Sequence, residues 1–358
     1  MKNVLAIDIG AGTMDVMCYV PDENMHYKAV VKSPVRTLGA DIAATEGNLV
    51  VSGVEMGGGQ VTEALKSRAR RAEVVLTASA AATIHHDAER VKAMGMRVVA
   101  DRDAEKFWSD PAFTPVKLQD IDSQRIRQIV EGFGLPFEFA SVAVCAQDHG
   151  AAPAGVSHLD FRHQLFKSRL DAQPYPHTLL YSADTLPEAF HRLHCIAQSA
   201  SDLPTEQVYV MDSGMAAIAG ASMDASLKQK ETYMVLDIAT SHTVGAVVGR
   251  GELLASFEYH THDITLERLE RLMRDLADGK LEHHSILAEG GHGAYLRHAP
   301  GFDRIEAIVA TGPKRRLLAE STMAITWGAP WGDNMMTGCV GLLRALRHRE
   351  EKGSLGIF

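Results

Sequence analysis

The sequence predicts an α/β protein built from two related domains that face each other. Three observations lead to this prediction. The chain has 358 residues, which is long enough for two hydrophobic cores. A strand–turn–strand pattern near the N-terminus recurs after residue 230. In both copies an apolar strand runs into an aspartate and then into a turn of small residues.

The duplicated pattern consists of two three-stranded meanders. The strands of the first copy are expected at residues 3–9, 14–20 and 25–31. Their counterparts in the second copy are expected at residues 232–237, 243–248 and 252–258. Because a repeated meander needs a second sheet to belong to, this pattern favours two related units over one large sheet.

The segments between the meanders are more varied. Residues 33 to about 135 are expected to form a mostly helical insertion, and residues 139–145 a buried strand. The stretch 153–176 is rich in loop-forming residues. A short strand at 208–211 leads into a helix of small residues at 214–221. The chain is expected to end with a strand, a Gly-Pro turn and a helix from about residue 334.

Composition narrows the class of function. The formal net charge is -9 and there is no extended basic block, so we expect no nucleic-acid-binding face. No apolar stretch is as long as a membrane span, and the N-terminus does not resemble a signal peptide, so we expect a cytoplasmic protein. The four cysteines are far apart in sequence, which predicts reduced thiols rather than a zinc site or a cysteine-bound iron–sulfur cluster.

The end of the first strand carries the most specific motif, Asp8-Ile9-Gly10-Ala11-Gly12-Thr13-Met14-Asp15. The two glycines let the backbone approach a phosphate closely, so that N–H groups and the Thr13 hydroxyl can point at its oxygens. A carboxylate at the end of the strand is suited to hold a hydrated Mg²⁺ beside that phosphate. The alternative for a bare Gly-x-Gly turn is a tight hairpin without a ligand, but the full string is far more specific.

Together with four later segments, this motif resembles the superfamily of actin, the heat-shock chaperone ATPases, and the sugar and acetate kinases. The later segments begin at Asp212, Asp237 and Ala310 and lie around Gly338. The resemblance implies two ribonuclease-H-like domains with a nucleotide cleft between them, and ATP and Mg²⁺ as ligands. It covers the core of both domains, but neither the insertion nor residues 150–176. Within the superfamily the chain looks nearest to an uncharacterised prokaryotic family sometimes labelled pyruvate formate-lyase activating protein-like.

The resemblance also implies a domain division. The first domain would span residues 1–228 and include the insertion, and the second would span residues 229–333. Residues 334–358 would form a C-terminal helix that packs back on the first domain. Around the cleft, the implied nucleotide contacts come from Asp8, Gly10, Gly12, Thr13, Asp15, Asp237, Thr240, Ser241, His242, Thr243, Thr311, Gly312 and Pro313. Asp8 and Asp237 would be the metal ligands.

Two residues of the second phosphate loop depart from the superfamily pattern. In an alignment without gaps, Ala239 stands where the superfamily prefers glycine, and His242 stands opposite Thr13. Alanine is tolerated where φ stays negative. Histidine can donate a hydrogen bond to a phosphate, but it is bulkier and titratable. These departures are more compatible with nucleotide binding than with fast turnover.

Three residues are candidates for catalysis. Asp212 matches the position at which the sugar-kinase branch carries the aspartate that accepts a proton from the attacking hydroxyl; its alternative role is to cap the following helix. Gln147 and Asp148 leave a buried strand on the side of the expected cleft, where they could orient a water or a second substrate. The alternative for both is a polar turn.

The histidines allow a further hypothesis. His260 and His262, and the pair His283 and His284, could bind a transition metal, whereas His292 has no firm role. Alternating histidines at a strand end are more typical of a solvent-facing edge, and this alternative stays open.

Three functions follow from these observations. The first is a small-molecule kinase or ATPase with Mg-ATP in the cleft. The second is an ATP-driven activase or chaperone-like protein that acts on a protein client. The third is a nucleotide-binding scaffold with little catalysis. A homodimer is compatible with each of them, and the sequence identifies neither the acceptor nor the client.

Overall fold

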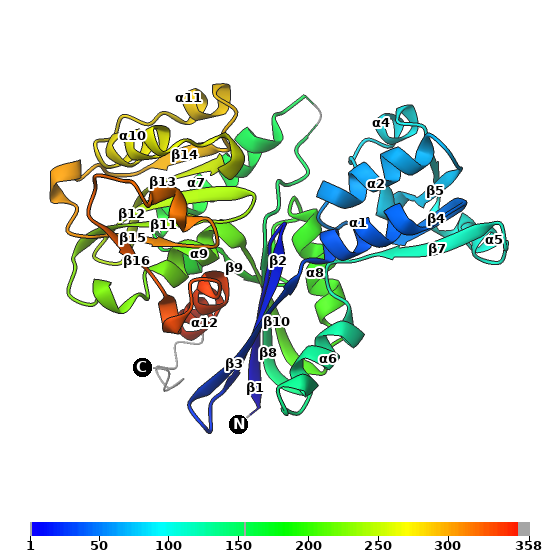
Figure 1. Cartoon of the computed structure of the whole chain (residues 1–358), viewed down its shortest axis with the longest axis horizontal. Helices are drawn as coiled ribbons and strands as arrows, with labels where there is room; N and C mark the ends of the chain where they lie inside the picture. Colours follow the sequence, from blue (N-terminus) through cyan, green and yellow to red (C-terminus); the bar gives the residue numbers. More distant parts are fainter. Residues whose placement is uncertain (1, 154, 350–358) are drawn as a thin grey trace.

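The computed structural model describes residues 2–153 and 155–349 of the chain. In this part the chain forms two β-sheets of six strands and one of four, with helices on their faces (Figure 1). None of the helices within these residues combines the length and the apolar character needed to cross a lipid bilayer. The mixed α/β class predicted from the sequence is confirmed.

The first six-stranded sheet is built on the N-terminal meander. Its strands, in spatial order, are β3 (Met25–Lys32), β2 (Thr13–Val20), β1 (Asn3–Ile9), β8 (Phe139–Ala146), β10 (Thr205–Asp212) and β9 (Leu180–Ser182). The meander is antiparallel, whereas β8 runs parallel to β1 and β10 runs parallel to β8. The carboxyl ends of β1, β8 and β10 therefore lie at the same edge of the sheet, where ligands commonly bind in α/β proteins.

The second six-stranded sheet repeats the central part of this plan. Its strands, in spatial order, are β14 (Gly293–Leu296), β13 (Glu252–His260), β12 (His242–Gly249), β11 (Thr232–Ile238), β15 (Ile308–Thr311) and β16 (Ile325–Trp327). As in the first sheet, the meander is antiparallel and the next strand, β15, runs parallel to the first strand of the meander. The duplication expected from the sequence is confirmed.

The segment expected to be a mostly helical insertion needs correction, because a four-stranded parallel sheet lies at its centre. The order of the strands is β6 (Arg97–Val99), β5 (Val74–Thr77), β4 (Asn48–Gly53) and β7 (Phe113–Leu118). The helices of the segment are α1 (Pro34–Ala44), α2 (Gly59–Ala69), α3 (Ala78–Ala81), α4 (Ala88–Ala93) and α5 (Glu105–Trp108). Short parallel strands are buried on both faces and lack the alternating pattern that identifies a strand in sequence.

The stretch 153–176 also differs from expectation, because it contains the 15-residue helix α7 (His158–Ala172). Only Arg162 and Leu170 are buried on this helix, so the sequence has no apolar stripe from which a helix could be predicted. The other helices near the two large sheets are α6 (Ser123–Gly132), α8 (His191–Ala200), α10 (Leu266–Ala277) and α11 (His283–Ala288).

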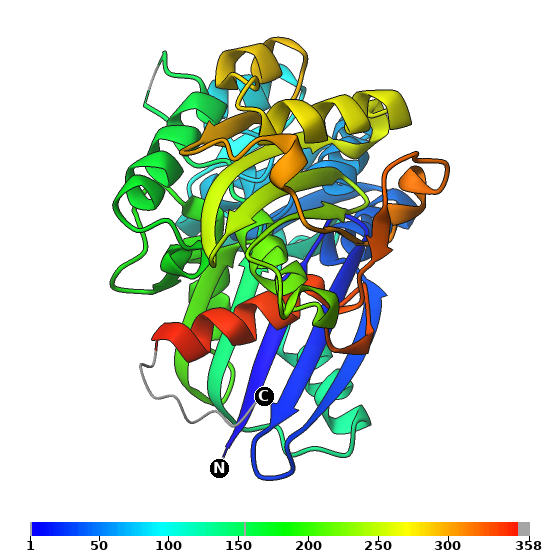
Figure 2. The same cartoon turned by 90° about the vertical axis from the view of Figure 1, so that its left-hand side faces the viewer.

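Two further helices, α9 (Ser213–Ala221) and α12 (Thr337–Arg349), cross in close contact, and α12 also lies against β1 and β8 (Figure 2). Glycines make the close approach possible. A Cβ on Gly220 would lie 1.8 Å from the carbonyl oxygen of Thr337, and a Cβ on Gly341 would lie 1.8 Å from that of Ala216. The end of the C-terminal segment, residues 350–358, lies outside the described residues.

We expect Gly341→Ala to lower the free energy of unfolding by about 3 kcal/mol, because the new methyl group meets a backbone carbonyl that cannot rotate away. Gly132→Ala is the matched control: this helical glycine has no atom within 4 Å of the added Cβ, so the change should be neutral or stabilise by about 0.5–1 kcal/mol. Urea denaturation of both variants measures the difference. Equal stabilities would contradict the role given to the crossing.

Candidate functional site

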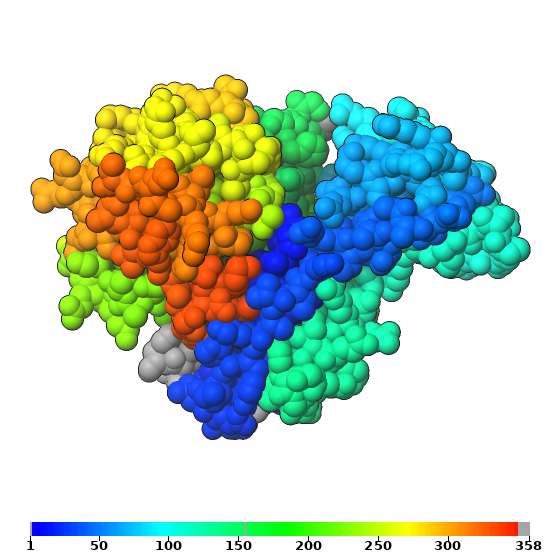
Figure 3. Space-filling model, viewed as in Figure 1, coloured from blue at the N-terminus to red at the C-terminus, as the bar shows by residue number. Residues whose placement is uncertain are grey.

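A cavity of about 740 Å³ opens between the two six-stranded sheets and the four-stranded unit. In Figure 3 the hollow lies between the yellow and orange part of the surface and the blue and cyan part. Its walls come from the turn after β1, the turn after β11, the loop after β8, and the segments 55–59 and 82–86 of the four-stranded unit. This volume is large enough for a ligand of nucleotide size.

The turns after β1 and β11 have the same backbone geometry. The Gly10 N–H donates to the Thr13 carbonyl oxygen at 2.9 Å, and the Ala239 N–H donates to the His242 carbonyl oxygen at 3.0 Å. The alignment that places Ala239 opposite Gly10 and His242 opposite Thr13 is therefore structurally correct. The turns also meet, because a Cβ on Gly12 would lie 2.8 Å from the Thr240 hydroxyl oxygen.

Three aspartates surround the point where the turns meet. Asp8 and Asp15 are paired across β1 and β2, and Asp237 occupies the position on β11 that Asp8 occupies on β1. Burial, together with the charge of Asp237, raises the pKa of Asp8 to about 7, against a hydrogen bond from Cys145. Burial and the charge of Asp8 raise the pKa of Asp15 to about 8. Burial raises that of Asp237 to about 6, against a hydrogen bond from Thr311.

This carboxyl cluster fits a divalent cation. Like charges in a buried site oppose ionisation, and a bound cation removes that penalty. One carboxyl oxygen of Asp15 is buried without any hydrogen-bond partner among the described residues. Helix α12 also makes room for the cluster, since a Cβ on Gly338 would lie 2.1 Å from Oδ2 of Asp8. Any side chain at position 338 would displace the carboxyl group.

The expected adenosine loop follows β15. Gly312 has a φ of +87° and lies so close to the turn after β11 that a Cβ would be 2.6 Å from the Ile238 carbonyl oxygen, so only glycine fits there. Gly312 and Pro313 line the cavity. Thr311 does not, because its side chain turns inward and its hydroxyl donates to the Asp237 carboxylate at 2.9 Å. Thr311 thus orients Asp237 and is not itself exposed to the cavity.

Asp212 is buried at the end of β10, and it is not among the side chains that line the cavity. One of its oxygens accepts from the Met215 N–H at 3.2 Å and so caps α9. The other accepts from Nη2 of Arg162 at 2.6 Å, and Nη1 of Arg162 donates to Glu258 at 2.7 Å. Burial by itself would lower the pKa of Arg162, but its two carboxylate partners hold it above the ordinary value.

Gln147 and Asp148 line the cavity at the end of β8. The amide of Gln147 donates to Glu258 and lies 3.3 Å from Nδ1 of His292. Both carboxylate oxygens of Asp148 accept from the backbone, one from the Gly150 N–H at 2.7 Å and one from the Leu193 N–H at 2.9 Å. Asp148 therefore holds the loop and the start of α8, which is the role of a polar turn.

Most of the residues expected at the cleft line one cavity. They are Asp8, Gly10, Gly12, Thr13, Asp15, Gln147, Asp148, Asp237, Thr240, Ser241, His242, Gly312 and Pro313. Three others, Asp212, Thr243 and Thr311, are buried behind its wall. The exclusion of Thr243 follows from its position on β12, where its hydroxyl faces that of Thr261 at 3.0 Å.

Several cavity residues had no place in the site expected from sequence. Glu258, His149, His260 and His292 line the side formed by the second sheet, and Asp120, His86 and Arg192 line the opposite side. Arg192 donates to Asp120 at 2.8 Å and to the Gln147 carbonyl oxygen at 2.7 Å. The only sequence signal for this group was the unusual number of histidines, which did not indicate which of them meet.

Comparison with known proteins identifies a family. A family model described as "Putative pyruvate format-lyase activating enzyme (DUF1786)" matches residues 56–317 of the chain. The match covers most of the cavity wall, including the turn after β11 and the loop after β15. No curated protein matches the sequence.

Several solved structures are similar over nearly the whole chain. One is "Lmo2764 protein, a putative N-acetylmannosamine kinase, from Listeria monocytogenes", with 10% identity, a TM-score of 0.36, and 97% of this chain and 99% of that chain covered. Another is the "Activator of the 2-Hydroxyisocaproyl-CoA Dehydratase from Clostridium difficile with bound ADPNP", with 10% identity, a TM-score of 0.36, and 98% and 97% covered. Likenesses of this strength support no inference about function.

Proposed function

The chain belongs to this family, and from that premise we propose that it binds Mg-ATP in the cavity and acts as a phosphotransferase or ATPase. The observation that carries the proposal is the pair of matching turns, each following a strand with a buried aspartate near its end, that meet at the cavity. Phosphoryl transfer depends on positioning and charge neutralisation more than on covalent chemistry by the protein. Backbone N–H groups at the turns and a cation held by aspartates would supply both.

Each part of the cavity wall has a role in this proposal. The turn residues Gly10, Gly12, Thr13, Thr240 and Ser241 would contact the phosphates, and Gly312 and Pro313 the adenosine. Asp8 and Asp237 would hold the hydrated Mg²⁺, which neutralises the charge of the phosphates. Asp15 would accept hydrogen bonds from the water around it.

A phosphoryl acceptor would bind on the side formed by residues 147–163. Asp212 would then serve as the base, provided that acceptor binding draws it away from Arg162, to which it is now paired at 2.6 Å. We also propose that residues 1–228 and 229–333 are two domains that close on the nucleotide, and that α12 links back to the first.

The family description does not carry over as radical chemistry. An enzyme that generates a glycyl radical needs an iron–sulfur cluster held by cysteines. Cys18, Cys145 and Cys339 are buried thiols, Cys195 is half-buried, and none of the described groups of three or more metal-ligating side chains contains a cysteine.

A second candidate function is nucleotide binding with slow turnover, as in a scaffold or in an activase that acts on a protein client. His242 favours it, because this residue replaces the hydroxyl of Thr13 in the matching turn. Burial lowers the pKa of His242 to about 4, so the ring is neutral near pH 7. A neutral imidazole stabilises transferring phosphate charge less than a cation would.

Calorimetry with ATP and Mg²⁺ tests the proposal directly. We expect binding that weakens when Mg²⁺ is removed with EDTA, and a rise in melting temperature with nucleotide concentration. A metabolite screen for ADP release then separates the functions: stimulation by one small molecule indicates a kinase, and stimulation only by a protein indicates an activase. No binding of any purine nucleotide would refute the central claim.

A further inference from the structure

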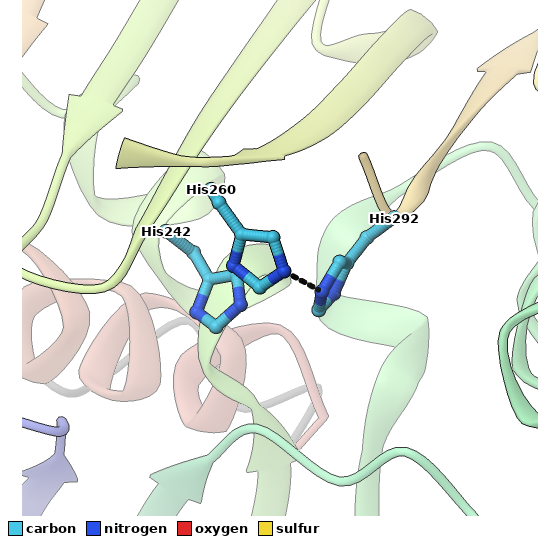
Figure 4. Close-up of side chains that lie close together, drawn as sticks. All are labelled: His242, His260 and His292. Carbon is cyan, nitrogen blue, oxygen red and sulfur yellow. Dashed lines mark hydrogen bonds between the residues drawn. The ribbon is translucent and has the colours of Figure 1, made fainter. Parts of the chain in front are cut away.

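Three histidines from different elements of the second sheet converge on the cavity. His242 begins β12, His260 ends β13 directly opposite it, and His292 precedes β14 (Figure 4). One ring nitrogen of each lies within 4.8 Å of the others, and all three residues line the cavity. The cluster adjoins the turn that carries Thr240 and Ser241, but it is separate from the aspartates assigned to Mg²⁺.

The spacing of the rings suits a shared metal ion. Zinc binds histidine nitrogens at about 2.0–2.1 Å in tetrahedral geometry, which places two ligand nitrogens about 3.3 Å apart. The Nε2 atoms of His260 and His292 are 3.2 Å apart. The Nε2 atom of His242 is buried and has no hydrogen-bond partner among the described residues. A metal ion would satisfy this atom, whereas a hydrogen-bonded histidine cluster leaves it without a partner.

A buried carboxylate orients His292 for this role. Nδ1 of His292 lies 3.3 Å from Oε1 of Glu258, and the other oxygen of Glu258 accepts from Arg162 at 2.7 Å. Metal-binding histidines commonly donate their second N–H to such a carboxylate, which fixes the tautomer and turns the Nε2 lone pair toward the metal. Arg162 and Glu258 thus have a purpose that the nucleotide site does not require.

Two other groups of possible ligands are less suited. His284, in the group with Asp160 and His283, has a side chain that is 87% exposed. In the group of Glu55, His86 and His191, two of the three residues are not buried against solvent in the same way, and Glu55 is already paired with His86 at 2.9 Å.

We propose that His242, His260 and His292 bind a divalent transition metal of the zinc type, with an open coordination position toward the cavity. Three imidazole ligands and a free fourth position are the pattern of a reactive rather than a purely structural zinc site. The open position would hold water or an oxygen of the second substrate and polarise it. This proposal does not depend on nucleotide binding, since none of the three ligands needs ATP to be in place.

A cobalt titration tests the site. Untagged full-length protein, treated with EDTA and dialysed, is titrated with Co²⁺ without nucleotide, and visible absorption reports four-coordinate metal. We expect one equivalent, and at least hundredfold weaker binding in His242→Ala and His292→Ala. His262→Ala is the matched control, because His262 is close in sequence to His260 but its side chain is 73% exposed; its affinity should equal that of the parent. Circular dichroism checks that each variant is folded.

Two further measurements separate the possible outcomes. Millimolar Mg²⁺ should not displace Co²⁺, because imidazole ligands prefer transition metals; displacement would put the metal at the aspartates and overturn the proposal. Glu258→Gln should weaken binding by about 10- to 100-fold while His86→Ala and His283→Ala leave it unchanged. Absence of stoichiometric binding, or its loss only in His86→Ala or His283→Ala, would also overturn it.

Discussion

Asp8→Asn should abolish the Mg²⁺-dependent part of ATP binding, weakening affinity in the presence of Mg²⁺ by about a hundredfold or more. The amide has the shape of the carboxyl group and fits against Gly338, but it carries no charge to hold the cation. Because the pKa of Asp8 is raised to about 7 by burial and by Asp237, removing its charge relieves repulsion in the free protein. The melting temperature without ligand should therefore stay the same or rise.

Two comparisons sharpen this test. Gly338→Ala keeps the charge of Asp8 but forces its carboxyl group to move, so it should also lose the Mg²⁺-dependent binding. Asp41→Asn removes a charge from an exposed position on α1 and should leave calorimetric titrations unchanged. If Asp8→Asn binds Mg-ATP as tightly as the parent does, the cation is held elsewhere.

Asp212→Asn should lower turnover by about a hundredfold or more if Asp212 is the base, since the amide cannot accept the proton. The structure adds a second expectation. The amide oxygen can still cap α9, but Arg162 would keep only one of its two carboxylate partners. Breaking a buried ion pair from one side typically costs about 3–5 kcal/mol, so the variant should also melt at a lower temperature.

The matched control for this loss of stability is Asp120→Asn, which breaks another buried pair, between Asp120 and Arg192 at 2.8 Å. It should lower the melting temperature without the hundredfold loss of turnover, when rates are compared per folded molecule at a temperature well below both transitions. If Asp212→Asn turns over ATP as fast as the parent on that basis, Asp212 is a helix cap and a partner of Arg162, and another group must accept the proton.

The strands of the two meanders could be predicted from the sequence because their signals are local. An apolar run that ends in Asp8 or Asp237 and continues into a turn of small residues needs no knowledge of the rest of the chain. The four-stranded parallel sheet was missed for the opposite reason. Its strands are three to six residues long, and their burial comes from helices that precede and follow them in sequence.

The sequence by itself determined the duplicated α/β plan, both turns of the candidate phosphate site, and the departures at Ala239 and His242. Each depends on residues within a few positions of one another, whose backbone conformations are set by local sterics. Only the tertiary structure decided that Asp212 is paired with Arg162, and that His242, His260 and His292 meet beside Glu258. Those contacts join residues 18 to 96 positions apart, and their charges and ring nitrogens become partners only when the sheets and α7 are packed.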